Sequence, residues 1–139
     1  MTRPDISMLP MQGDLHNRRC PARQIVDHVA GLWGGLILKA LSNQGKLRFG
    51  ELRRQLDGIS DKMLAKSKRT LERDGFVTRD CFPVVLPRVE CLLTPIGLEC
   101  ASHVLAVCDF VETHVHSIVN QQIAYDASPA TASWQTPRS

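Results

Sequence analysis

Apolar residues recur every three or four positions in three stretches of the chain, and this spacing predicts helices. The first stretch runs from Pro21 to Leu41, and a shorter second one runs from Phe49 to Leu56. The third begins at about residue 95 and continues to about residue 123. Residues 76–82 and 89–94 are rich in β-forming residues and are joined by a loop with two prolines, so we predict a hairpin there.

The segment from Ser60 to Arg73 predicts a further helix, with two different faces. Ser60 can cap the free N–H groups at its start, and Ile59 and Leu64 occupy the positions of a hydrophobic staple. At about 100° per residue, four cations share an arc of about 60°, with two leucines opposite. The cations are Lys62, Lys66, Arg69 and Arg73, and the leucines are Leu64 and Leu71. We therefore expect this helix to pack through its leucines and to expose its cations.

Length and charge distribution refine this picture. The chain has 139 residues, of which 43% are hydrophobic and 22% charged, enough for one domain with one core. Lys46 to Arg79 holds ten basic and five acidic residues, whereas Pro95 to Pro137 holds four acidic residues and no lysine or arginine. This segregation is typical of a polyanion-binding module joined to a different working surface, although unevenly charged solvated surface would look the same.

Several classes of protein are disfavoured. No apolar run approaches the roughly 18 residues that a membrane span needs, and the N-terminus lacks a signal peptide, so we expect a cytoplasmic protein without membrane contact. The five cysteines are odd in number and lack CxxC spacing, so they suggest neither a disulfide framework nor a zinc finger. We therefore expect a protein of a reducing compartment, with no metal and no cofactor. Residues 1–17 and 126–139, which include Trp134, are predicted to be flexible tails.

The predicted order is helix, short helix, basic helix, hairpin and long helix. It indicates a mainly α fold of the winged helix-turn-helix type, with a two-stranded wing, over residues 18–119. The last helix, at about residues 95–123, has a longer apolar stripe than one packing face requires. A homodimer interface is a natural use for this stripe. Its expected residues are Ala101, Val104, Cys108, Val111, Val115 and Ile118.

The stretch from Cys20 to about Val111 resembles the HxlR family of bacterial transcription regulators. An ordered series of short matches over roughly ninety residues carries the resemblance. It comprises Cys20-Pro21, Gly31 with Trp33, Ile37-Leu38, Arg48-Phe49, Glu51-Leu52, Gly58-Ile59-Ser60, Lys62-Met63-Leu64, Arg69, Leu71-Glu72, Asp74-Gly75, Val77, Arg79, Pro87-Arg88-Val89-Glu90, Leu93-Thr94 and Gly97.

The chain also departs from the family pattern at several positions. Leu32 replaces a common lysine, Gly34-Gly35 replaces bulkier residues, and Gly50 replaces a usual asparagine. Lys68 stands where the family generally has a core leucine, and Cys91 stands where it has an aromatic residue. We expect the stem of Lys68 to pack at the edge of the apolar face while its amine reaches water. These changes should alter helix packing and DNA preference but leave the fold intact.

The resemblance implies a sequence-specific regulator, here taken as a repressor, that binds double-stranded DNA as a homodimer on a palindromic operator. The helix from Ser60 to Arg73 would enter the major groove, residues of the preceding helix would hold the backbone, and the wing would approach the minor groove. The expected DNA-binding residues are Arg53, Arg54, Ser60, Asp61, Lys62, Lys66, Arg69, Arg73 and Arg88.

Cys20 is a candidate sensor of small oxidants or electrophiles. It follows two arginines and precedes a predicted helix start, both of which favour thiolate, and some family members sense such compounds near this position. A buried structural thiol is the alternative. Two other function classes stay open: a thiol enzyme that pairs Cys20 with His28, which lacks any catalytic motif, and a winged-helix module that binds protein instead of DNA.

Overall fold

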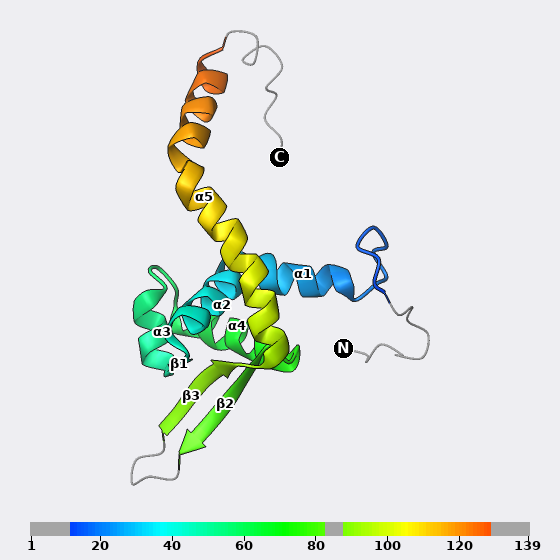
Figure 1. Ribbon diagram of the computed structural model, residues 1–139, viewed down its shortest axis with the longest axis vertical. Coiled ribbons are helices and arrows are strands. Elements are labelled where there is room, and N and C mark those ends of the chain that lie inside the picture. Colours follow the sequence, from blue (N-terminus) through cyan, green and yellow to red (C-terminus); the bar gives the residue numbers. More distant parts are fainter. Residues whose placement is uncertain (1–11, 83–87, 129–139) are drawn as a thin grey trace. The chain divides into compact units, whose positions relative to one another are not determined.

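The computed structural model describes residues 12–82 and 88–128 of the chain. The predicted elements follow one another in the predicted order, with two helices in place of the first one and an additional short strand (Figure 1). They are α1 (Ala22–Ala30), α2 (Leu32–Gln44), β1 (Lys46–Leu47), α3 (Phe49–Gln55), α4 (Asp61–Arg73), β2 (Val77–Phe82), β3 (Arg88–Leu93) and α5 (Pro95–Ala127). The chain divides into two units after Leu105, within α5.

The single helix predicted from Pro21 to Leu41 is wrong, because the structure has two helices there. Gly31 adopts an extended backbone (φ −64°, ψ 154°) that ends α1, and α1 and α2 are bent by 65°. Gly34 then lies so close to α1 that a Cβ atom would come within 1.8 Å of the carbonyl oxygen of His28. The apolar spacing continues across this break, so periodicity alone did not reveal it, although α1 contributes only the partly buried Val29 to the core.

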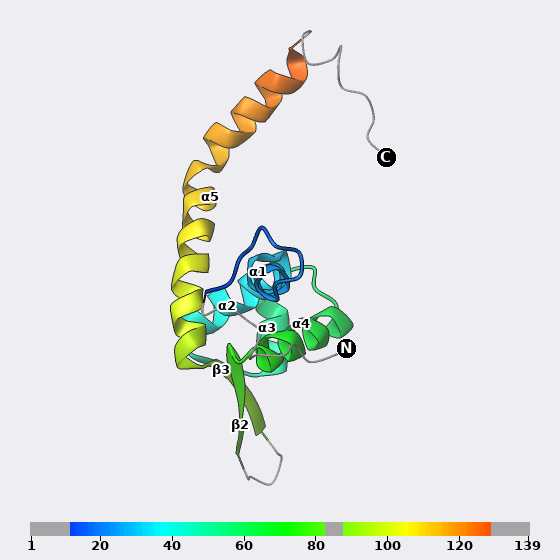
Figure 2. The same ribbon diagram turned by 90° about the vertical axis from the view of Figure 1, so that its right-hand side faces the viewer.

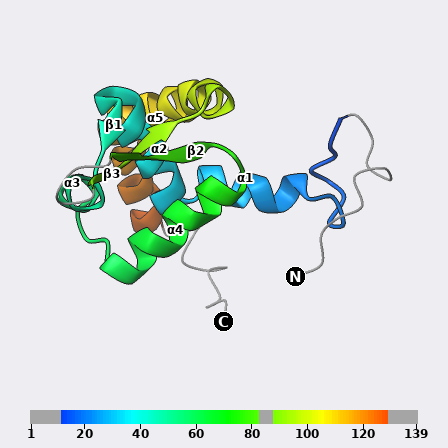
Figure 3. The same cartoon turned by 90° about the horizontal axis from the view of Figure 1, so that it is seen from below.

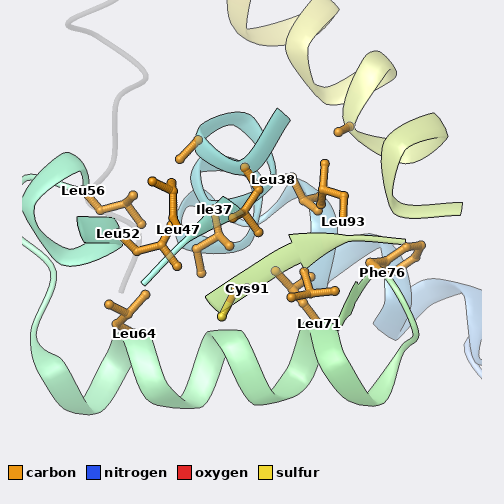
Figure 4. Close-up of a cluster of buried hydrophobic side chains, with 14 of the residues drawn as sticks. Ile37, Leu38, Leu47, Leu52, Leu56, Leu64, Leu71, Phe76, Cys91 and Leu93 are labelled. Carbon is orange, nitrogen blue, oxygen red and sulfur yellow. The ribbon is translucent and has the colours of Figure 1, made fainter. Parts of the chain in front are cut away.

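The core of the first unit is built mainly from aliphatic side chains, with α2 at its centre (Figure 4). Ile37 and Leu38 of α2 are fully buried, as are Leu64 and Leu71 of α4. Figure 4 shows both α4 leucines pointing from the helix into this cluster. Burial of these two apolar side chains stabilises the packing of α4 against the core.

Local capping explains where α4 begins. The Ser60 hydroxyl accepts a hydrogen bond from the backbone N–H of Met63 at 3.1 Å, and Ile59 is buried together with Leu64. Gly58 precedes them with φ +89°, a conformation that side-chain-bearing residues rarely adopt. The predicted cap and staple of this helix are therefore confirmed.

The wing strands β2 and β3 form the predicted antiparallel hairpin, in register from Val77↔Leu93 to Phe82↔Arg88. Figures 1 and 2 show them running side by side away from the helices. The sheet also contains a third strand, β1, which pairs with β3 through Leu47↔Cys91. Two residues are too short for a sequence alternation, so β1 carried no signal of its own.

The helix α5 begins at a well-defined cap. The Thr94 hydroxyl donates to the carbonyl of Gly75 at 2.6 Å and accepts from the backbone N–H of Gly97 at 3.1 Å. A Cβ atom on Gly97 would lie 2.0 Å from the carbonyl oxygen of Phe76, so glycine is required for this approach. The helix extends to Ala127, slightly beyond the start predicted for the C-terminal tail.

The predicted tails fall mostly outside the described residues, and Trp134 lies there as well. Residues 12–17 of the first tail are described and exposed. Over residues 12–82 and 88–128, no single helix is long and apolar enough to cross a membrane. Only α1 and α2 taken together pass such a test, by length and composition alone, and α2 is the core helix of this unit.

Candidate DNA-binding surface

The four cations predicted to share one face of α4 are all exposed. Lys62, Lys66, Arg69 and Arg73 face solvent while Leu64 and Leu71 are fully buried. Figure 3 shows α4 on the outside of the first unit, with α2 behind it. The helix therefore presents a cationic ridge, defined here as these four side chains, with room for a large polyanion to approach.

Two candidates at the start of α4 have roles inside the protein. The Ser60 hydroxyl caps the helix, and the Asp61 carboxylate forms an ion pair with the guanidinium of Arg53. Both members of this pair are more than half exposed, so it contributes at most about 1 kcal/mol to stability. The pair links α3 to the first turn of α4, and a phosphate could replace Asp61 as the partner of Arg53.

The short helix α3 supplies the remaining cations of this surface. Arg53 and Arg54 are exposed in its last turn, as predicted from their position on the polar side. The backbone N–H of Arg48 donates to the Glu51 carboxylate at 3.0 Å, which helps to fix the start of the helix. The structure thus brings the basic last turn of α3 next to the first turn of α4 through the Arg53–Asp61 pair.

Lys68 does not belong to the cationic ridge, and its side chain is largely buried, as expected for its stem. Its side chain is only 15% exposed, and its ammonium lies 3.7 Å from the Glu72 carboxylate and 5.9 Å from the centre of the Phe49 ring. The sequence placed Lys68 at the edge of the apolar face but gave no sign of these partners, which come from a distant helix and from the next turn of α4.

The wing also provides an exposed cation, Arg79, that is not among the expected DNA-binding residues. Arg79 on β2 is exposed and lies 3.5 Å from the other oxygen of Glu72. The alternation of side chains along a strand predicts that Arg79 lies on the same side as Val77 and Cys81, but it does not predict the contact with Glu72. The side chain of Arg88, the wing residue predicted to contact DNA, is outside the part of the chain that the structure describes.

The candidate sensor Cys20 is half-buried, immediately before α1. Its sulfur accepts a hydrogen bond from the backbone N–H of Asp14 at 3.4 Å. His28, the partner imagined for a thiol enzyme, is instead bound to Asp74 through Nδ1 at 2.6 Å. That bond connects α1 to the end of α4 and gives His28 a structural role. Among the described residues, no group of three His, Cys, Asp or Glu side chains could hold a metal ion.

The residues predicted to form a dimer interface on α5 divide into two sets. Ala101 is 0% exposed within its own unit, so its assignment to an interface is wrong: it packs in the core, where α5 leaves the sheet. Val104 and Cys108 are half-buried, and Val104 packs against the core. Val111, Val115 and Ile118 are exposed.

Exposed apolar side chains in the second unit extend beyond this stripe. They are Val107, Phe110, Val119, Ile123 and Tyr125. The Phe110 ring stacks on the His114 ring with centroids 4.4 Å apart. The three-and-four spacing selected only one row of a helix that is apolar on more than one side. An exposed apolar surface of this kind commonly marks a protein interface.

Comparison with known proteins identifies close relatives of this architecture. The model of the HxlR-like helix-turn-helix family matches residues 28–119. The HTH-type transcriptional regulator YtfH of Escherichia coli (strain K12) is 41% identical over 119 residues, which cover 86% of this chain and 94% of the relative.

Solved structures agree with this match. The transcriptional regulator ytfH from Salmonella typhimurium is 43% identical with a TM-score of 0.75, covering 80% of this chain and 98% of that one. The redox regulator HypR in its reduced form is 32% identical with a TM-score of 0.64, covering 72% of this chain and 98% of that one.

Proposed function

The chain belongs to the HxlR-like helix-turn-helix family of transcriptional regulators and is not an enzyme, and on this basis we propose that it represses transcription by binding a palindromic operator as a homodimer in the cytoplasm. The observation that carries the proposal is the cationic ridge on α4, exposed along the whole helix. An α-helix fits the DNA major groove, where side chains near its N-terminus read base edges.

We assign three roles to the candidate residues. Lys62 and Lys66, together with Asp61, lie toward the N-terminal part of α4 and contact bases or nearby phosphates. Arg69 and Arg73 on the ridge, with Arg53 and Arg54 of α3, bind phosphates, and Arg88 of the wing approaches the minor groove. Phosphate contacts supply affinity that falls with salt, whereas only base contacts supply specificity.

The exposed apolar residues of α5 beyond Leu105 support the proposed homodimerisation. Two copies joined through this segment would present their α4 helices to half-sites about one helical turn, or roughly 10 base pairs, apart. Selection of bound sequences from a random duplex pool tests this directly. We expect enrichment of an inverted repeat with that spacing, and the absence of any enriched sequence would contradict the proposal.

Retention on duplex DNA distinguishes the proposed DNA-binding regulator from a module of the same fold that binds only other proteins. A DNA-binding protein should elute at a salt concentration that drops steeply when ridge cations are removed, because each lost phosphate contact lowers the salt slope by about 1. An adaptor should show weak retention that does not depend on those residues.

We further propose that Cys20 responds to an oxidant or electrophile and that its modification alters DNA binding. The support is its incomplete burial, its backbone hydrogen bond and the similarity to the redox regulator HypR. Alkylation of the intact protein at neutral pH, followed peptide by peptide, tests the reactivity of this thiol. An alkylation rate at Cys20 no faster than that of a free thiol would contradict the proposed sensing role of this residue.

A further inference from the structure

Three charged side chains meet at the junction between α4 and the wing. Glu72 lies one turn after Lys68 on α4, and its Oε1 atom is 3.7 Å from the Lys68 ammonium. The other carboxylate oxygen of Glu72, Oε2, is 3.5 Å from the Nε atom of Arg79 on β2. At neutral pH two of these side chains are positive and one is negative, so the group keeps one positive charge that its own pairing does not cancel.

The two cations of this group differ in their exposure to water. The side chains of Lys68 and Glu72 are 15% and 20% exposed, whereas that of Arg79 is 62% exposed. The Oε1 atom of Glu72 is buried and has no hydrogen-bond partner among the described residues, so the Lys68 ammonium is what compensates its charge. Solvent screens the attraction between Glu72 and Arg79 more than it screens this inner pair. The uncancelled positive charge is therefore presented to solvent at Arg79.

Arg79 extends the basic surface of α4 onto the wing. On β2 it comes two residues after Val77, which is buried in the core, and two-residue spacing keeps both side chains on one side of the strand. Residues three apart on a helix are neighbours, so Glu72 adjoins Arg69 of the cationic ridge. Because Arg79 is held at Glu72, its guanidinium lies next to the ridge.

We propose that Arg79 binds a phosphate of the DNA backbone strand that runs between the groove read by α4 and the groove approached by the wing, and that Lys68 makes Arg79 available by neutralising Glu72 from inside the protein. The inference rests on the function proposed above, because it requires α4 and the wing to lie in adjacent grooves of one duplex. A side chain at the junction of these two elements then faces the backbone that separates the grooves. Such a contact adds affinity and reads no base.

The role of Lys68 follows from what happens to Glu72 when Arg79 turns to a phosphate. An exposed ion pair contributes little, so Arg79 leaves the carboxylate at small cost. Lys68 stays beside Glu72, and no buried charge is left without a partner. In the absence of Lys68, the departure of Arg79 would leave a largely buried carboxylate uncompensated. Lys68 is thus a positioning residue that acts through Arg79 and does not touch DNA.

Salt-dependent binding of a labelled duplex recovered from the random pool tests the phosphate contact. Arg79→Ala should lower the affinity by about 3- to 10-fold at roughly 0.15 M salt and reduce the log–log salt slope by about 1. Two controls should bind as the wild type does: Thr78→Ala, on the other side of β2, and Arg19→Ala, which removes one exposed charge before α1. Wild-type affinity and slope for Arg79→Ala would overturn the proposal. The function proposed above would still stand if Lys62→Ala/Lys66→Ala lost affinity in the same assay.

A double-mutant cycle tests whether Lys68 acts through Arg79. Lys68→Met keeps the length of the side chain but removes its charge, and it should lose most of the affinity that Arg79→Ala loses. Introduced into Arg79→Ala, it should lower the affinity by less than about twofold further, because the two changes remove the same contact. Fully additive losses would show that Lys68 contributes only diffuse positive charge, and they would overturn its assigned role.

Removal of both charges of the inner pair separates this role from damage to the fold. In Lys68→Met/Glu72→Gln no buried carboxylate remains to hold Arg79 back, so the affinity should return to within about twofold of the wild type. An affinity as low as that of Lys68→Met would contradict the proposal. Circular dichroism shows whether each variant folds. If Lys68→Met does not fold, Lys68→Gln takes its place in the cycle, since its amide can still donate a hydrogen bond to Glu72.

Discussion

The helices α4 and α5 differ in how far their apolar residues are buried within the single chain. In α4 the two leucines are fully buried within the first unit, and the opposite side carries only solvent-exposed charge. In α5 beyond Leu105, apolar side chains such as Val111 and Phe110 are exposed, and no lysine or arginine accompanies them. The apolar side of α4 is buried within the single chain, and its charged side faces solvent. The apolar surface of α5 is exposed, and a second copy of the chain would bury it.

The largest expected effect comes from placing charge in the apolar surface of α5. In Val111→Glu/Val115→Glu, four carboxylates of a dimer would be buried in the interface, which is prohibitively costly without partners. We expect a monomer by sedimentation, with affinity for a two-half-site operator lower by about 100-fold or more because the two copies no longer bind as one.

The matched control keeps the same charge change on another side of this helix. Thr113→Glu/Asn120→Asp adds two carboxylates at exposed positions away from the apolar row. This variant should sediment as the wild type does. Equal dissociation of both double variants would show that net charge, and not the apolar row, governs assembly.

Truncation of the buried side of α4 should lower stability instead. Leu71→Ala removes a fully buried side chain and leaves a cavity, which costs about 2–5 kcal/mol of unfolding free energy in comparable cores. Val119→Ala on α5 serves as the comparison, because Val119 is exposed within its unit. Denaturant unfolding of a monomeric background, such as the double glutamate variant, should show a large loss for Leu71→Ala and almost none for Val119→Ala.

The sequence was most informative where local chemistry decides the structure. The start of α4 follows from the Ser60 cap and the Ile59–Leu64 staple, and its two faces follow from helical periodicity, so both were predictable. The hairpin and the long last helix were predictable for the same reason. The exposed position of the cationic ridge follows from the same periodicity.

Features set by contacts between distant segments were not predictable. The break at Gly31 depends on the close approach of Gly34 to the His28 carbonyl, and the strand β1 depends on β3. Ala101 has the spacing of an interface residue but is buried in its own unit. The Lys68 ammonium lies 5.9 Å from the centre of the Phe49 ring, which belongs to another helix. Periodicity records which side of a helix is apolar but not which segment covers it.

The smallest predicted effect concerns the cap of α4. Ser60→Ala removes the acceptor of the Met63 backbone N–H and should cost about 1 kcal/mol of stability. Ser60→Asp should restore the cap and add a favourable charge at the helix N-terminus. Thermal unfolding of both variants measures this, and equal destabilisation by the two would show that Ser60 acts through something other than capping.

The most direct test of the account is the salt dependence of duplex binding by Lys62→Ala/Lys66→Ala. Arg18→Ala/Arg19→Ala provides the control, since it removes the same charge from exposed positions before α1. If α4 binds the duplex through its ridge, the first variant loses affinity by about 10- to 100-fold and its log–log salt slope falls by about 2, while the control stays close to the wild type. Identical slopes and affinities for the wild type and both variants would contradict the central claim.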